Sequence, residues 1–186
     1  MQDSQLEYKK REEGYQEQLN GLKAKINWTS NVRLITVVLG LGLSIYLYFQ
    51  NQDLLADILL FVTIVTFIAL VLIHNRFKSD AKKAKVLLEI NIDSIKRING
   101  EWDSFDDSGP EFEDYEHPFT SDLDIFGNHS LFQWMNTAVT YSGRRVLKRW
   151  LDTPANDIEV IKNRQAAAKE LAILLDWRQN YQAEAK

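Results

Sequence analysis

The feature that most constrains this chain is a pair of long apolar runs in its first half. Leu34–Phe49 is sixteen residues without a charge, and Leu54–Ile73 is twenty residues with one charged side chain, Asp57. A helix needs about 20 mostly apolar residues to span a bilayer, and about 17 are tolerated when flanking side chains snorkel. The first run reaches that length when Val32 is included. Because backbone groups in lipid must be hydrogen-bonded within their own segment, the runs predict two membrane-spanning helices.

Basic residues around the runs predict how such a hairpin would be oriented. The link between the runs, residues 50–53, has no Lys or Arg. The flanks outside the runs carry Lys23, Lys25, Arg33, Arg76, Lys78, Lys82, Lys83 and Lys85. Under the positive-inside rule we expect both termini in the cytoplasm, with residues 32–74 anchoring the chain in the inner or plasma membrane through spans at about 32–49 and 54–73. The alternative is a helical hairpin buried in a soluble core, but the rest of the chain is not apolar enough to surround it.

Amphipathic helices are predicted on both sides of the hairpin. In residues 1–31, apolar side chains recur at heptad-like spacing, at Tyr8, Tyr15, Leu19, Leu22 and Ile26, which favours a helix that pairs with a partner. Residues 75–99 form a juxtamembrane helix whose lysines we interpret as topology determinants attracted to anionic lipid, in preference to a DNA-binding patch. Gly40 and Gly42 could allow close helix approach, but we find no small-xxx-small repeat that would indicate a dimerisation face.

Residues 100–125 are predicted to be a solvated acidic linker. Residues 101–124 contain ten acidic side chains and no Lys or Arg, and glycines and prolines interrupt any periodicity. His117, Asp122, Asp124 and His129 are residue types that bind divalent metals, but their spacing matches no common ligand pattern, so we expect no metal site. The chain has no cysteine, which excludes thiolate metal sites and disulfides, and its net charge of -4 argues against general nucleic-acid binding.

Residues 126–186 change to a pattern of compact helices. Ser130 can cap a helix through "LFQWMNTAV", and a second helix begins near Ser142 and runs through "GRRVLKRWL". Pro154 ends that helix. A third helix is expected to start at Asn156 or Asp157, with Asn156 and Glu159 as a capping box, and to extend at least to Trp177. Its apolar stripe comprises Ile158, Ile161, Ala168, Leu171, Ala172, Leu174 and Leu175. This stripe is larger than the preceding helices can cover, so the sequence predicts an unfinished core.

The stretch "DLDIFGNHSLFQWMNTAVTYSGRRVLKRWLDTPANDIEVIKNRQAAAKEL" resembles the start of the core (lever) domain of MutS-family DNA mismatch-repair proteins. The family pattern is T-x-x-G-x-R-x-L-x-x-W-L, then P, then D-x-x-x-I-x-x-R-Q. It falls here on Thr140, Gly143, Arg145, Leu147, Trp150, Leu151, Pro154, Asp157, Ile161, Arg164 and Gln165. The acidic segment before it is similar to a subgroup of MutS-related proteins with N-terminal transmembrane segments. We therefore expect an all-α chain ending in a partial helical lever domain.

The resemblance also implies activities for a complete protein. Such a protein would bind DNA, ATP and Mg²⁺, and would act as a homodimer. The family's phosphate-binding loop ends in GK[ST], and no such motif occurs in these 186 residues, so we expect no ATPase activity and no cofactor site from this chain alone. The family's mismatch-reading domain is replaced here by the apolar hairpin.

The basic cluster at residues 144–149 is interpreted as scaffold. Arg145, at a family-pattern position, is predicted to be an ion-pair or helix-terminus partner. Arg144, Lys148 and Arg149 are predicted to solvate the opposite face, and nucleic-acid contact is the weaker alternative for these three residues. We expect no catalytic residue.

Three functions are compatible with these patterns. The first is the membrane-anchoring and lever portion of a MutS-related ATPase. The second is a membrane-tethered helical scaffold that binds a partner without DNA or ATP. A small membrane enzyme ranks last, because the sequence offers no nucleophile, base and orienting group in a recognisable set.

Overall fold

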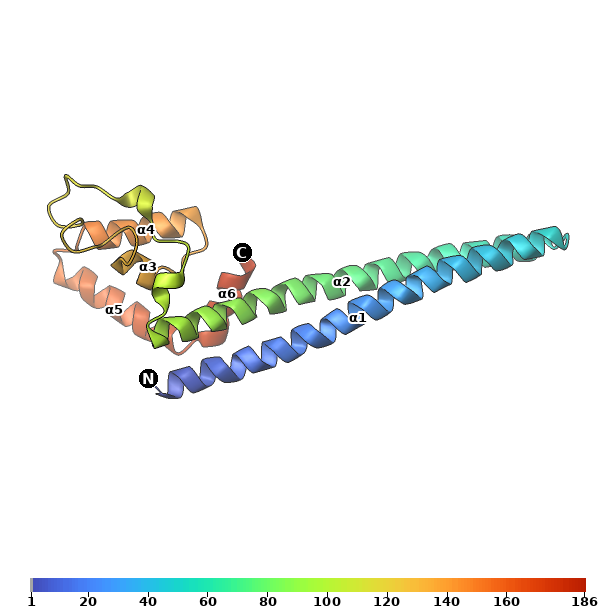
Figure 1. Cartoon of the computed structure of the whole chain (residues 1–186), viewed down its shortest axis with the longest axis horizontal. Coiled ribbons are helices and arrows are strands. Elements are labelled where there is room, and N and C mark those ends of the chain that lie inside the picture. Colours follow the sequence, from blue (N-terminus) through green and yellow to red (C-terminus); the bar gives the residue numbers. More distant parts are fainter. Residues whose placement is uncertain (1) are drawn as a thin grey trace. The chain divides into compact units, whose positions relative to one another are not determined.

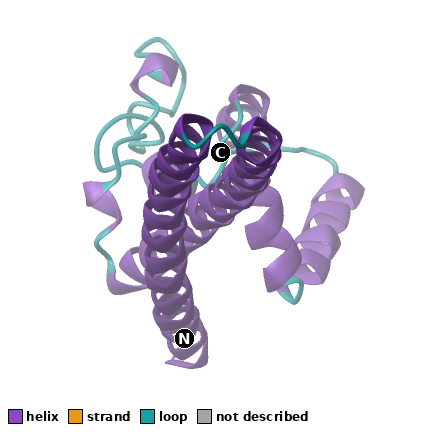
Figure 2. Ribbon diagram, turned by 90° about the vertical axis from the view of Figure 1, so that its right-hand side faces the viewer, coloured by secondary structure: helices purple, strands orange, loops and turns teal. Residues whose placement is uncertain are grey.

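The computed structural model describes residues 2–186, which contain helices and turns and no strand (Figures 1 and 2). The α-helices are α1 (Gln2–Phe49), α2 (Asp53–Asn99), α3 (Leu131–Met135), α4 (Tyr141–Asp152), α5 (Ile158–Ala172) and α6 (Leu175–Glu184). Two short 3-10 helices, η1 (Trp102–Ser104) and η2 (Pro110–Phe112), lie in the acidic segment. The prediction of an all-α fold is confirmed.

The chain divides into two compact units. The hairpin unit comprises residues 13–85, and the C-terminal unit comprises residues 2–12 together with residues 86–186. The amphipathic and apolar segments predicted separately at residues 1–31 and 32–49 lie on one uninterrupted helix, α1, and those at 54–73 and 75–99 lie on α2. Neither helix contains a proline, and Gly14 and Gly21 have open space around them, so nothing local ends the helices at the predicted boundaries.

Within the hairpin unit, α1 and α2 run antiparallel and side by side (Figures 1 and 2). The heptad-like residues Leu19 and Leu22 are buried there, so the partner predicted for this stripe is α2 of the same chain. The connection at residues 50–52 is tight: Asn51 has φ 58°, and the N–H of Gln52 donates to the carbonyl of Leu47 at 3.1 Å. Asparagine adopts this left-handed conformation at lower cost than most residues.

Small and hydroxyl side chains let the two helices approach closely in the apolar region. A Cβ placed on Gly40 would overlap the side chain of Thr63, whereas Gly42 has open space. Ser44 is buried, and its hydroxyl donates to the carbonyl of Gly40 at 2.8 Å. Gly40 and Ser44 are four residues apart, so the expectation that a small-xxx-small repeat is missing was wrong. The repeat serves contact within the hairpin.

The apolar runs are largely uncovered by the rest of the described chain. In the most apolar stretches of α1 and α2, 6% and 11% of the residues are buried, and both helices are long and apolar enough to cross a membrane. Asp57 is exposed, in the turn of α2 that follows the connection. A hairpin buried in a soluble core would have shielded these side chains, and residues 2–186 do not do so.

The C-terminal unit is built around a small aromatic core. Ile125, Phe126 and Phe132 are buried, and Phe132 has no exposed surface. Partly buried side chains pack against them, namely Phe112, Phe119, Leu131, Leu147 and Leu151. Two of these five residues, Phe112 and Phe119, belong to the segment predicted as a solvated acidic linker, and so does the buried Ile125. Residues 105–126 therefore fold onto α3 and α4, because burying their aromatic side chains gains more free energy than is lost by holding the surrounding carboxylates near the protein surface.

Two helix ends differ from the sequence prediction. α3 stops at Met135, four residues before the predicted end at Val139. The predicted third helix is two helices, α5 and α6, with the break at Ile173 and Leu174, so it does not continue to Trp177. The end of α3 is set by contacts with another part of the C-terminal unit, the side chain of Arg97.

Candidate functional site

The residues that carry the family pattern fix the shape and packing of α4 and α5. Thr140 is the N-cap of α4, and its hydroxyl accepts from the N–H of Gly143 at 3.1 Å. A side chain on Gly143 would crowd Thr140 and Ala138, which explains the glycine. Leu147 and Leu151 pack against the aromatic core. These positions therefore have structural roles. α4 itself begins at Tyr141, one residue before the predicted start at Ser142.

Arg144 joins α4 to the acidic segment. One of its terminal nitrogens, Nη2, lies 2.7 Å from Asp107 Oδ1 and 2.6 Å from Glu111 Oε1. Its guanidinium is also 5.4 Å from the ring centre of Phe112 and 5.9 Å from that of Phe132. The hydrogen bond with Asp107 raises the pKa of Arg144 above its ordinary value, and the nearby Glu111 adds to the effect. We call these residues the Arg144 cluster.

The structure exchanges the roles predicted for Arg144 and Arg145. The ion-pair partner in this helix is Arg144, which was expected to solvate the outer face. Arg145 is exposed and lies over the ring of Tyr141, with its guanidinium 5.6 Å from the ring centre. Both residues sit in the first turns of α4, and only the position of the folded acidic segment distinguishes them.

Lys148 and Arg149 lie further along α4. Lys148 forms an ion pair with Asp152 one turn later. Burial raises the pKa of Asp152, but hydrogen bonds from Lys148 and Thr153 outweigh it, so the net pKa lies below the ordinary 3.8. Arg149 is exposed in the last turn, where a cation is favoured by the helix dipole.

Contacts around the break at Pro154 orient α5 against α4. Trp150 of α4 is half exposed, and the guanidinium of Arg164 on α5 lies 4.6 Å from the centre of its ring. Asp157 is the N-cap of α5, with its carboxylate accepting from the N–H of Glu159 at 2.8 Å. The predicted capping box between Asn156 and Glu159 was therefore wrong by one residue, because Asp157 itself takes the capping position.

The predicted apolar stripe of the last helices remains uncovered within the described chain. Ile158 is 68% exposed. Ile161, Leu171 and Leu174 are also exposed. This agrees with the expectation that the helices from α3 onward do not complete a hydrophobic core by themselves.

Arg97 is a structural residue that sequence reasoning missed. Its Nη2 donates to the carbonyl of Asn136 at 2.7 Å and its Nε donates to the carbonyl of Trp134 at 3.1 Å, while its guanidinium lies 4.3 Å from the ring centre of Phe105. Burial lowers its pKa. These bonds satisfy carbonyls at the end of α3, which explains why α3 stops there. The sequence shows Arg97 only as one of several basic residues in α2.

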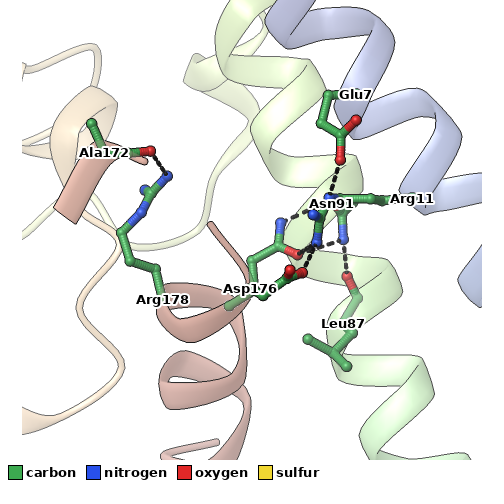
Figure 3. A network of polar contacts seen from close by, with 8 residues as sticks. Glu7, Arg11, Leu87, Asn91, Ala172, Asp176 and Arg178 are labelled. Carbon is green, nitrogen blue, oxygen red and sulfur yellow. Dashed lines mark hydrogen bonds and ion pairs between the residues drawn. The ribbon is translucent and has the colours of Figure 1, made fainter. Parts of the chain in front are cut away.

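A second polar network holds α6 against the two long helices (Figure 3). Arg11 bonds to Asp176 at 2.5 Å and to Glu7 at 2.7 Å, and the bond to Asp176 raises the pKa of Arg11. Gln179 donates to Asn91 Oδ1 at 2.9 Å, and both of these amide side chains are buried. We call these five residues the α6 network. Its partners are up to 168 residues apart in the chain, so no local pattern announces it.

The C-terminal unit has two grooves along α2. Two grooves of about 420 and 590 Å³ border residues 90–98 and the stretch from Asn136 to Thr140, and neither contains a glycine-rich phosphate loop. Among residues 2–186 no group of three or more His, Cys, Asp and Glu could hold a metal ion. His117 instead packs edge-on against Phe119, with ring centres 4.7 Å apart. The residues present therefore do not fit ATP and Mg²⁺.

Comparison with known proteins relates the last part of the C-terminal unit to one family. Residues 117–186 match the family model of MutS domain III, which supports a relationship to the MutS family. The matched region begins in the acidic segment and includes α3 to α6. No solved structure matches the chain.

Proposed function

We propose that this chain is the membrane-anchoring and lever portion of a MutS-related protein, a relative of the DNA mismatch-repair ATPases. The match of residues 117–186 to MutS domain III carries this proposal. The exposed apolar faces of α5 and α6 support it, since a lever domain needs further helices to cover them. In this role α3 to α6 form scaffold, and the family-pattern residues cap and pack helices.

The proposed anchor is the pair of apolar runs in the hairpin unit. Their uncovered side chains are suited to lipid, and the flanking Lys and Arg residues favour a hairpin with both ends in the cytoplasm, at the inner or plasma membrane. Alkaline extraction of cell membranes tests this. We expect the chain to stay in the membrane pellet, and release into the supernatant would refute the anchor.

DNA and ATP binding belong to the proposal for the complete protein, which we expect to be a homodimer. DNA binding is tested with the full natural chain in detergent, by fluorescence anisotropy with duplex and branched DNA. Affinity should fall steeply between about 50 and 200 mM salt, as for proteins that contact several phosphates. Residues 1–186 alone should not hydrolyse ATP, and detectable hydrolysis would overturn this assignment.

The second candidate is a membrane-tethered scaffold that binds a protein partner without DNA. The observation that favours it is the exposed aromatic pair on α6, where the rings of Trp177 and Tyr181 stack with centres 5.4 Å apart. Such aromatic groups are common at the centres of protein interfaces. A folded full chain that captures a partner while showing no salt-sensitive DNA binding would favour the scaffold over the MutS-related machine.

A further inference from the structure

A histidine is buried in the contact between α1 and α2 of the hairpin unit. His74 directly follows the second apolar run and is 7% exposed. Its ring nitrogen Nδ1 is shielded from solvent and has no hydrogen-bond partner within residues 2–186. Buried polar atoms without a partner are uncommon in folded proteins, because they lose their bonds to water and gain no other bond. His74 is therefore held in this contact at a cost in free energy.

The neighbouring contacts show what His74 faces on α1. The ammonium of Lys25 lies 5.7 Å from the ring centre of Phe77, so these two residues are at the same level. Because the helices run antiparallel, His74, three residues before Phe77, lies near the level of residues 28 and 29. Thr29 is the buried residue there, with an exposed fraction of 1%. Its hydroxyl donates to the carbonyl of Lys25 at 2.7 Å, so that proton is not available to His74.

The charged side chains around this level are almost all positive. Within about two turns on the two helices they are Lys25, Arg33, Arg76 and Lys78. The nearest carboxylate along α2 is Asp80, six residues from His74, or about 9 Å along the helix. α1 contains no Asp or Glu after Glu17. A proton on His74 would therefore add a positive charge to a buried contact that offers no counter-charge, which is costly.

We propose that His74 makes the packing of α1 against α2 sensitive to pH. The helices stay together while the imidazole is neutral, and they separate at this level when it gains a proton. Histidine is the side chain that ordinarily changes its charge between pH 5 and 8. Separated helices expose His74 to water, so they bind more protons than packed helices do. The packing is therefore most stable near pH 8 and is weakened as the pH falls towards 5.

The composition of the chain allows the effect to be traced to one residue. The three histidines are His74, His117 and His129, and the last two belong to the C-terminal unit. Exposed carboxylates stay mostly ionised at pH 5. The inference goes beyond the proposed anchor and lever. Because it rests on contacts within the hairpin unit, it can be tested with the full chain in micelles of a neutral detergent.

A buried thiol can report how often the helices separate. The chain contains no cysteine, so Thr29→Cys places a single thiol near the level of His74, at a shielded position. A dithiopyridine reagent, which works at both pH 5 and pH 8, reaches this thiol only when the helices separate. Each rate is divided by that of the same chain carrying His74→Gln, which cancels the thiol's own dependence on pH. The ratio should rise by up to about 30-fold from pH 8 to pH 5, as for a side chain that titrates near pH 6.5 in water and takes up no proton when buried.

Two outcomes would overturn the proposal. The first is a ratio that changes by less than about threefold between the two pH values. His74→Leu, which also lacks a titratable group, is the reference if His74→Gln no longer shields the thiol at pH 8. The second concerns a chain with both His117→Gln and His129→Gln, which retains His74 and should show the full rise. Loss of the rise in that chain would place its origin in the C-terminal unit.

Discussion

Replacement of Arg144 should loosen the acidic segment from α4. Arg144→Gln removes the ion pairs with Asp107 and Glu111 and the contacts with two phenylalanine rings. The carboxylates are 40% and 47% exposed, so solvent screening limits each pair to about 0.5 kcal/mol. Each ring contact adds about 0.5 kcal/mol. The sum is about 2 kcal/mol, or about a 30-fold change in an equilibrium constant.

Hydrogen–deuterium exchange of the full chain in detergent can measure this local opening. The N–H of Gly127 donates to the carbonyl of Ser108 at 2.9 Å, and that of Phe132 donates to the carbonyl of Ile125 at 2.9 Å, so both amides are protected only while the segment is folded. Their exchange should become about 30-fold faster in Arg144→Gln, as the preceding free energy requires.

Arg145→Gln is the matched control, because it removes the same charge from the next position of the same helix. Arg145 contacts the ring of Tyr141 at an exposed site, so its loss should cost at most about 0.5 kcal/mol. Equal acceleration of exchange in the two variants would refute the argument that Arg144, and not Arg145, helps to hold the acidic segment on α4. An acceleration below about threefold in Arg144→Gln would show that the aromatic core holds the segment unaided.

Three further predictions concern other contacts. Gly40→Leu should push the two helices of the hairpin apart, because the leucine side chain would overlap Thr63 of α2, and the thermal midpoint in detergent should fall. Gly42→Leu is the control: the space around Gly42 is open, so the midpoint should stay unchanged. Gln179→Ala removes the donor to Oδ1 of the buried Asn91 and should destabilise α6 by about 1–3 kcal/mol, which faster exchange of the α6 amides would show. Equal exchange in the variant and the wild type would contradict this. Since the pKa of Asp152 is lowered in the folded chain, its contribution to stability is present above about pH 4 and is lost as the pH falls below that value. Asp152→Asn should therefore flatten this part of a stability-versus-pH curve. An unchanged curve would be inconsistent with the ion pair between Lys148 and Asp152.

Local patterns in the sequence were sufficient to predict which segments are helical and where some of the helices begin and end. Apolar runs without breakers predicted the helical stretches at residues 32–49 and 54–73, which are parts of α1 and α2, and heptad-like spacing identified the buried stripe at Leu19 and Leu22. Ser130 caps α3 as predicted, and the chain leaves α4 before Pro154 as predicted. The resemblance of residues 126–186 to a lever domain is supported by the family match. These features depend on side chains within one or two helical turns of each other.

Contacts between segments that are distant in the sequence could not be predicted from local patterns. The sequence offers Arg144 and Arg145 as neighbours of the same charge, and only the folded acidic segment selects Arg144 as the ion-pair partner. The same holds for Arg97, which meets the end of α3 from 37 residues away. Charge alone also suggested that residues 100–125 stay in solvent, whereas their phenylalanines pack around Phe132.

The sequence by itself therefore determined which segments are helical, where caps and breaks are favoured, and which stretches are apolar enough for a membrane. The tertiary structure decided where α3 stops and which basic residues are structural. The physical reason is the range of the interactions. Helix formation and capping act between residues up to about four apart, while the bonds of Arg97, Arg144 and Gln179 form only after the chain has brought distant groups together.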